Sequence, residues 1–67
     1  MDKIGDKALD KIVFILKNNS DGLTITDIVN KTHLNRSEVR IVLARLEGAE
    51  KVSIKKIGMA KVYTLKS

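Results

Sequence analysis

The arginines stand out chemically in this 67-residue chain, because Arg36, Arg40 and Arg45 all lie within one ten-residue stretch. The other ten basic residues are lysines. An arginine guanidinium is a planar fork that matches phosphate oxygens or the edge of a guanine, whereas a lysine ammonium acts as a mobile point charge. The stretch can therefore bind a polyanion, or it can form a solubilising helix face.

The charge of the chain is concentrated in its second half. The formal net charge is +5. Residues 1–30 carry four Lys against five Asp, whereas residues 31–67 carry nine Lys and Arg against three Glu, a formal charge of +6. This asymmetry makes nucleic acid or an anionic membrane surface the natural partner. A solvated basic face is the alternative.

The remaining residue types argue against catalysis and metal binding. Cys is absent and His33 is the single His, which excludes disulfides and a Cys/His zinc site. We expect His33 to pack in a turn or to face a phosphate. Asp2, Asp6 and Asp10 alternate with lysines and indicate a solvated helix face. The chain is also too short to enclose a substrate pocket of the usual size. We expect no enzyme activity, no metal, no cofactor and no small-molecule substrate.

The length predicts a single domain over residues 1–67 with a thin core, so that dimerisation or very regular packing must supplement its stability. The longest apolar run, over residues 12–16, is far shorter than a membrane span, and no signal-peptide pattern precedes it. We therefore expect a cytoplasmic, nucleoid-associated location.

The first half of the chain predicts two helices separated by a turn. Apolar residues at spacings of three and four indicate an amphipathic helix over residues 2–19, with its regular part starting near Asp6. Phe14 lies outside the apolar stripe, so it either widens the buried face or is exposed. Residues 18–22 form a turn, residues 23–25 alternate as a very short strand, and Thr26 is placed to cap a helix over residues 27–31.

The second half predicts a third helix and a hairpin. Asn35 is an N-cap with Glu38 at the third helical position, and the helix should end around Gly48. Residues 51–55 and 61–65 then alternate with period two, and Gly58 suits the turn over residues 56–60, so the two strands should pair antiparallel. We expect Tyr63 in the core with its hydroxyl at the surface.

This order of elements resembles the winged helix-turn-helix family. The resemblance rests on ITDIV at residues 25–29, LNRSEV at 34–39, LARLE at 43–47, and on VSI at 52–54 with YTL at 63–65, which look like the strands of a wing. The resemblance covers nearly the whole chain. The family includes regulators of the MarR, ArsR and TrmB kinds. Those families often have Gly four residues after the position of Leu46, where this chain has Glu50. The implied fold class is α+β, with three helices, a short strand before the second, and a two-stranded wing.

The resemblance implies a small transcriptional regulator that binds double-stranded DNA. A helix fits the major groove and enters it with its N-terminal turns near the bases, which are read at its outward positions. The implied base-facing residues are Arg36, Ser37 and Arg40, with Ile41 and Ala44 beside them. The implied backbone or wing contacts are Thr26, Arg45, Lys55, Lys56 and Lys61.

Several alternatives remain beside these assignments. Thr26 can be a cap only, and Arg45 can pair near Glu47 or Glu50. Ile57 and Met59 at the wing tip are expected to fold back or to contact a protein, in preference to wedging into DNA.

The partner also has alternatives. We expect a homodimer through the first helix around Phe14, and the competing function is a winged-helix protein-interaction module of a larger nucleic-acid-processing assembly. RNA is disfavoured because Phe14 and Tyr63 are the only aromatic residues. A membrane surface is the least favoured partner, because the most amphipathic segment, the first helix, is not the basic one.

Overall fold

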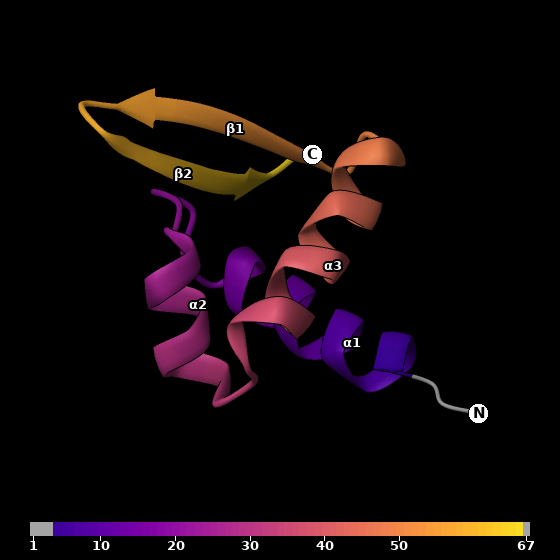
Figure 1. The fold of residues 1–67 in the computed structure, drawn as a ribbon. Helices are drawn as coiled ribbons and strands as arrows, with labels where there is room; N and C mark the ends of the chain where they lie inside the picture. The colour runs from indigo at the N-terminus through magenta and orange to yellow at the C-terminus, as the bar shows by residue number, and fades with distance from the viewer. Residues whose placement is uncertain (1–3, 67) are drawn as a thin grey trace.

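The computed structural model describes residues 4–66 and the side chains from residue 7 onward. It is an α+β structure of three helices followed by a two-stranded antiparallel hairpin, as predicted (Figure 1). The elements are α1 (Ile4–Lys17), α2 (Ile25–Thr32), α3 (Arg36–Gly48), β1 (Val52–Ile57) and β2 (Ala60–Leu65). The hairpin lies across one end of the helices, beside the start of α2 and the end of α3 (Figure 1), and packs on all three helices.

The core lies between the three helices and is closed by the hairpin. In α1 the buried residues recur every four positions, which confirms the amphipathic stripe. Each of the large side chains here contributes about 1.5–3 kcal/mol through the surface it removes from water. The core residues are Ala8, Ile12, Leu16, Leu23, Ile28, Val39, Val42, Leu43, Leu46, Val52 and Tyr63.

Helix α1 ends at Lys17, two residues before the predicted end at Asn19. The Asn19 side-chain amide donates to the Ile15 carbonyl at 2.7 Å, and the Gly22 N–H donates to the Asn19 carbonyl at 2.9 Å. These bonds stop the helix and turn the chain. The predicted first residues of this helix, Asp2 and Lys3, lie outside the described residues.

The predicted short strand over residues 23–25 is reduced to one residue. Leu23 forms an isolated antiparallel bridge with Tyr63, in which each N–H donates to the other residue's carbonyl at 2.9 and 2.8 Å. Thr24 already serves as the cap of α2, so no further strand residue is available. Leu23 and Tyr63 are both buried, and the expected core position of Tyr63 is confirmed.

The prediction that Thr26 caps the second helix is wrong. Helix α2 begins at Ile25, and the Thr24 hydroxyl accepts from the Asp27 N–H at 3.1 Å while the Asp27 carboxylate accepts from the Thr24 N–H at 3.2 Å. This reciprocal capping box needs an acid three residues after the threonine. Thr24 has Asp27 at that position, whereas Thr26 has Val29, which cannot reciprocate.

Helix α2 also ends one residue later than predicted, at Thr32. His33 follows in the left-handed conformation with φ 62°, and its N–H donates to the Val29 carbonyl at 2.8 Å. His33 is exposed at this turn, consistent with a role in the connection between the two helices.

Helix α3 has the predicted start and end. The Asn35 side chain accepts from the Glu38 N–H at 2.7 Å, and the helix runs to Gly48. After it, Glu50 adopts the left-handed conformation with φ 59°, and the Lys51 N–H donates to the Leu46 carbonyl at 2.8 Å. Glu50 thus turns the chain into β1, at the position where the resembling families often have Gly.

The hairpin is longer and tighter than predicted. Its register runs from Val52 opposite Leu65 to Ile57 opposite Ala60, so that the turn contains only Gly58 and Met59. The tip therefore projects from the helices. Ile57 and Met59 are 61% and 103% exposed and do not fold back onto the protein, and the other expected role, contact with a protein, stays a prediction. Phe14 is 65% exposed and does not widen the core. No helix within residues 4–66 is long and apolar enough to cross a membrane.

Candidate nucleic-acid interface

The first two turns of α3 carry the predicted base-facing residues. Arg36, Ser37 and Arg40 are all exposed, because Val39 and Val42 on the other side of the helix are buried against α1 and α2. Residues four apart lie side by side on a helix, so Arg36 and Arg40 share one face. The structure thus places the two arginines on one exposed face in the N-terminal half of α3.

Arg36 is linked to α2 through Thr26. Its Nη2 donates to the Thr26 hydroxyl at 3.2 Å, which joins the first residue of α3 to the second residue of α2. The hydroxyl that caps α2 belongs to Thr24, so the Thr26 hydroxyl is available to accept from the guanidinium. The two predicted contact residues therefore lie together.

Lys61 approaches the same place from the hairpin. It lines a small hollow of about 280 Å³ together with Thr24, Ile25, Thr26 and Ala60. The first N–H groups of a helix have no intrahelical partner, and the helix dipole adds partial positive charge at that end. The Asp27 carboxylate at this end is turned back to the Thr24 N–H. Thr26, Arg36 and Lys61, which belong to three different elements, therefore lie together at the start of α2.

Lys56 extends this basic group along the hairpin. It lies directly opposite Lys61 in the register, and residues two apart on a strand share a face, so both lysines project from the face that carries Tyr63. Tyr63 is buried, which means that this face is the one turned toward the helices. Lys55 pairs with Val62 and projects from the opposite face.

The opposed lysines are unfavourable for the hairpin itself. Of the six register pairs between residues 52 and 65, only Lys56 with Lys61 joins two like charges. Like charges directly opposite each other in an antiparallel pair destabilise it by several tenths of a kcal/mol. Binding of a polyanion would remove this repulsion.

Arg45 is separated from the other two arginines. It lies nine residues after Arg36, which is two and a half helical turns, and it lines a groove with Asp10 and Phe14 of α1. The structure therefore brings together Thr26, Arg36, Ser37, Arg40, Lys56 and Lys61 but leaves Arg45 on the other side of α3.

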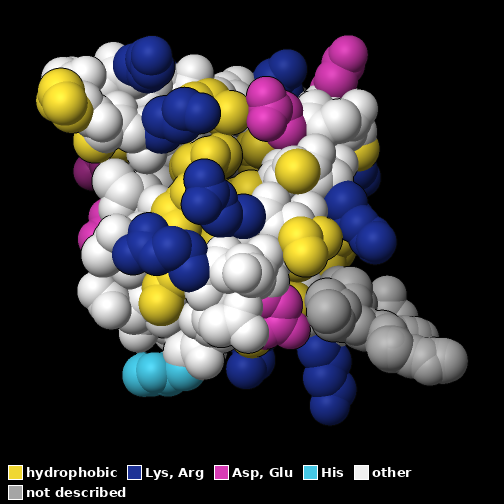
Figure 2. Space-filling model, viewed as in Figure 1, with side chains coloured by type: hydrophobic (Ala, Val, Ile, Leu, Met, Phe, Trp, Pro, Cys, Tyr) yellow, Lys and Arg dark blue, Asp and Glu magenta, His cyan; other side chains and the backbone are white. Residues whose placement is uncertain are grey.

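The basic side chains form a visible surface. Figure 2 shows Lys and Arg side chains gathered where α2, α3 and the hairpin meet, with apolar surface between them. We call Thr26, Arg36, Ser37, Arg40, Lys56 and Lys61 the basic face. Within the described residues, no three His, Cys, Asp or Glu side chains lie close enough together to hold a metal ion.

Two parts of this arrangement were missed from the sequence. The capping role of Thr24 was signalled by the spacing of Thr24 and Asp27, which fits the capping box. The opposition of Lys56 and Lys61 depends on the turn length, which Gly58 alone does not specify.

Comparison with known proteins provides no relative from which a function could be transferred. No protein-family model matches the chain, and no curated protein matches its sequence. The described residues form a small α+β protein that carries the basic face.

Proposed function

We propose that this chain is a winged helix-turn-helix protein that binds double-stranded DNA as a small transcriptional regulator. In this proposal α2 and α3 form the helix-turn-helix and the β1–β2 hairpin is the wing. The observation that carries it is the convergence of Thr26, Arg36 and Lys61 at the N-terminal end of α2. Such a regulator would work in the cytoplasm at the nucleoid.

The exposed N-terminal turns of α3 support its insertion into the major groove. The groove is wide enough for a helix and presents a distinct pattern of donors and acceptors for each base pair. Arg36 and Arg40 have the bidentate geometry for a guanine edge, and Ser37, exposed in the same turn, adds a short donor and acceptor. The hydrogen bond from Arg36 to Thr26 limits the freedom of its side chain before DNA is bound.

The start of α2 and the wing support contacts to the DNA backbone. Helix N-termini bind phosphate through their N–H groups, and Thr26 and Lys61 add a hydroxyl and a cation there. Lys56 continues the same face toward the wing tip, and Lys55 projects from the other face of the hairpin. These contacts would fix the orientation of α3 and would depend little on the sequence of the DNA.

A protein-interaction module of a larger nucleic-acid-processing assembly is the second candidate function. The exposed apolar side chains of Ile57 and Met59 at the tip favour it. The basic face disfavours it, because a cluster of cations needs an anionic partner.

The proposal is tested by the fluorescence anisotropy of a labelled random duplex at about 50–200 mM salt. Each phosphate contact steepens the fall of log affinity with log salt by about 0.9, so we expect a slope of several units. The Arg36→Ala/Arg40→Ala double variant should weaken binding, because it removes both base-facing guanidinium groups. Absence of binding at the lowest salt would contradict the proposal and favour the protein-interaction module, for which a pull-down is the next experiment.

Arg45→Ala provides a matched control for the single variant Arg40→Ala. Each removes one guanidinium from an exposed position of the same helix, but Arg45 lies outside the basic face. Arg40→Ala should weaken binding, and Arg45→Ala should leave it nearly unchanged. Equal losses would indicate attraction by net charge without the proposed orientation.

A further inference from the structure

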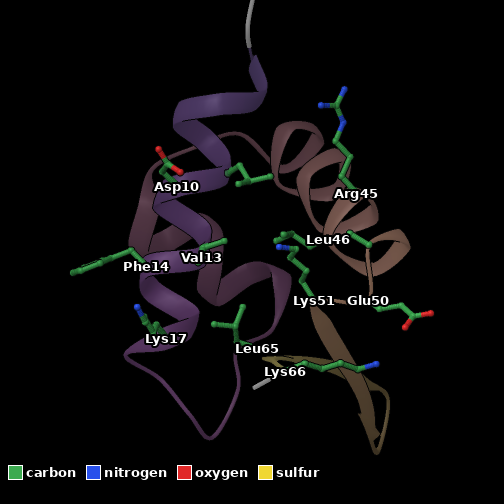
Figure 3. Close-up of a pocket in the computed structure, with 12 residues that line it drawn as sticks. Asp10, Val13, Phe14, Lys17, Arg45, Leu46, Glu50, Lys51, Leu65 and Lys66 are labelled. Carbon is green, nitrogen blue, oxygen red and sulfur yellow. The ribbon is translucent and has the colours of Figure 1, made fainter.

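The outer face of α1 carries an exposed phenylalanine between two opposite charges. Asp10, Phe14 and Lys17 are exposed and recur at spacings of four and three, so they form one stripe along the helix. Figure 3 shows the three side chains along the same side of α1, with Phe14 pointing away from the molecule. We call these three residues the α1 stripe.

An uncovered groove adjoins the α1 stripe. It has a volume of about 1030 Å³ and lies between α1, α3 and the base of the hairpin. Val13, Leu46 and Leu65 provide apolar side chains to its surface, and Val13 points into it in Figure 3. Phe14, which lines the groove's outer edge and points away from it, and the groove itself thus leave apolar surface uncovered beside α1.

The charges of the α1 stripe complement themselves when two copies of the helix run antiparallel. Asp10 and Lys17 are seven residues apart, about 10.5 Å along the axis, which is too far for a pair within one chain. In an antiparallel arrangement centred between residues 13 and 14, Asp10 of each copy lies opposite Lys17 of the other. Because Phe14 lies next to the centre of this arrangement and on the same side of α1 as the two charges, the Phe14 side chains of the two copies meet beside the twofold axis.

We propose that the α1 stripe is a homodimer interface, in which two copies of the chain pack their α1 helices antiparallel about a twofold axis. Such an interface is isologous, so every contact occurs twice. Shifting the register by one residue would bring Lys11 or Leu9 opposite Lys17 and separate it from Asp10, so the charges favour this register. The surface that packs on the α1 stripe must carry a basic residue opposite Asp10 and an acidic residue opposite Lys17, with an apolar residue between them. The α1 stripe of a second, antiparallel copy carries these residues in that order. The inference does not rest on DNA binding.

The first test is the oligomeric state of the chain measured by sedimentation equilibrium, up to about 1 mM protein. We expect a monomer–dimer equilibrium that Phe14→Ser shifts strongly to the monomer. Met59→Ser is the matched control, because it removes an exposed apolar side chain at the hairpin tip and should leave the equilibrium unchanged. Circular dichroism should show that both variants fold, since both positions are exposed. A wild-type chain that stays monomeric, or a dimer insensitive to Phe14→Ser, would overturn the proposal.

The second test uses the charges. Asp10→Lys gives a copy with two cations on the stripe, and Lys17→Asp gives one with two anions, so each variant alone should dimerise about 10-fold more weakly. An equimolar mixture of the two should recover wild-type affinity by forming the heterodimer. If the mixture dimerises no better than either variant alone, Asp10 and Lys17 do not meet across the interface.

Discussion

Lys56 and Lys61 lie directly opposite each other in the hairpin, one residue pair away from Ile57 and Ala60, which flank the turn. A threonine or an acid at either position would make a better cross-strand pair, because like charges repel at this separation. The pair instead continues the basic face that begins with Thr26 and Arg36. Local stability and the proposed binding of DNA therefore make opposite demands on these two positions.

The first prediction is that Lys56→Gln changes stability and DNA affinity in opposite directions. Removing one of the two charges should raise the free energy of unfolding by about 0.5 kcal/mol, measured by urea denaturation. The same variant should bind duplex DNA more weakly, with a salt slope smaller by about 1.

Lys66→Gln is the control for this prediction. Lys66 is exposed and lies at the groove beside α1, away from the basic face. It should change neither the free energy of unfolding nor the salt slope appreciably. A Lys56→Gln protein that is less stable, or that binds DNA as well as the wild type, would contradict the role assigned to the opposed lysines.

The second prediction separates the two threonines at the start of α2. Thr24→Ala removes the N-cap bond to the Asp27 N–H and should lower the free energy of unfolding by about 1 kcal/mol. Thr26→Ala replaces an exposed helical residue and should change it by less than about 0.5 kcal/mol. Thermal or urea denaturation of the two variants distinguishes them, and a larger loss for Thr26→Ala would contradict the capping box.

The sequence predicts those features that depend on neighbouring residues. The start of α3 follows from Asn35 and Glu38, and the buried face of α1 follows from the spacing of its apolar residues. The cap of α2 was misassigned because two threonines lie two residues apart, and only the acid at Asp27 decides between them. The position of Arg45 on the other side of α3 could also have been predicted, because nine residues after Arg36 is two and a half helical turns.

The composition of the basic face depends on tertiary packing and could not be predicted in the same way. Lys61 reaches Thr26 only because the hairpin packs across α2, and Lys56 opposes Lys61 only because the turn has two residues. A change of one residue in a strand register moves every side chain to the other face. Gly58 indicates a turn but does not fix that register.

The third prediction concerns the turn between α3 and β1. Glu50 adopts the left-handed conformation with φ 59°, which costs an L-residue about 1–2 kcal/mol and glycine very little. Glu50→Gly should therefore raise the free energy of unfolding by about 1 kcal/mol. Glu47→Gly is the control, because the same change inside α3 should lower it by about 1 kcal/mol. Destabilisation by both substitutions in urea would indicate that the Glu50 side chain makes a contact that outweighs its backbone strain.

The fourth prediction concerns the approach of the loop before α2 to the hairpin. Gly22 has φ 100°, and a Cβ there would overlap the Val62 side chain and lie 3.2 Å from the Tyr63 carbonyl oxygen. Gly22→Ala should therefore lower the free energy of unfolding by about 3 kcal/mol, through backbone strain and overpacking together.

Gly48→Ala is the matched control for this last change. Gly48 is the final residue of α3, and a Cβ there would meet nothing within 4 Å, so alanine should stabilise the helix by up to about 1 kcal/mol. The two substitutions add the same methyl group and are expected to have opposite signs. Urea denaturation followed by circular dichroism measures both, and a Gly22→Ala protein as stable as the wild type would mean that the loop does not pack against β2 at Val62. The Leu23–Tyr63 bridge, which holds the start of α2 beside Lys61, depends on that approach.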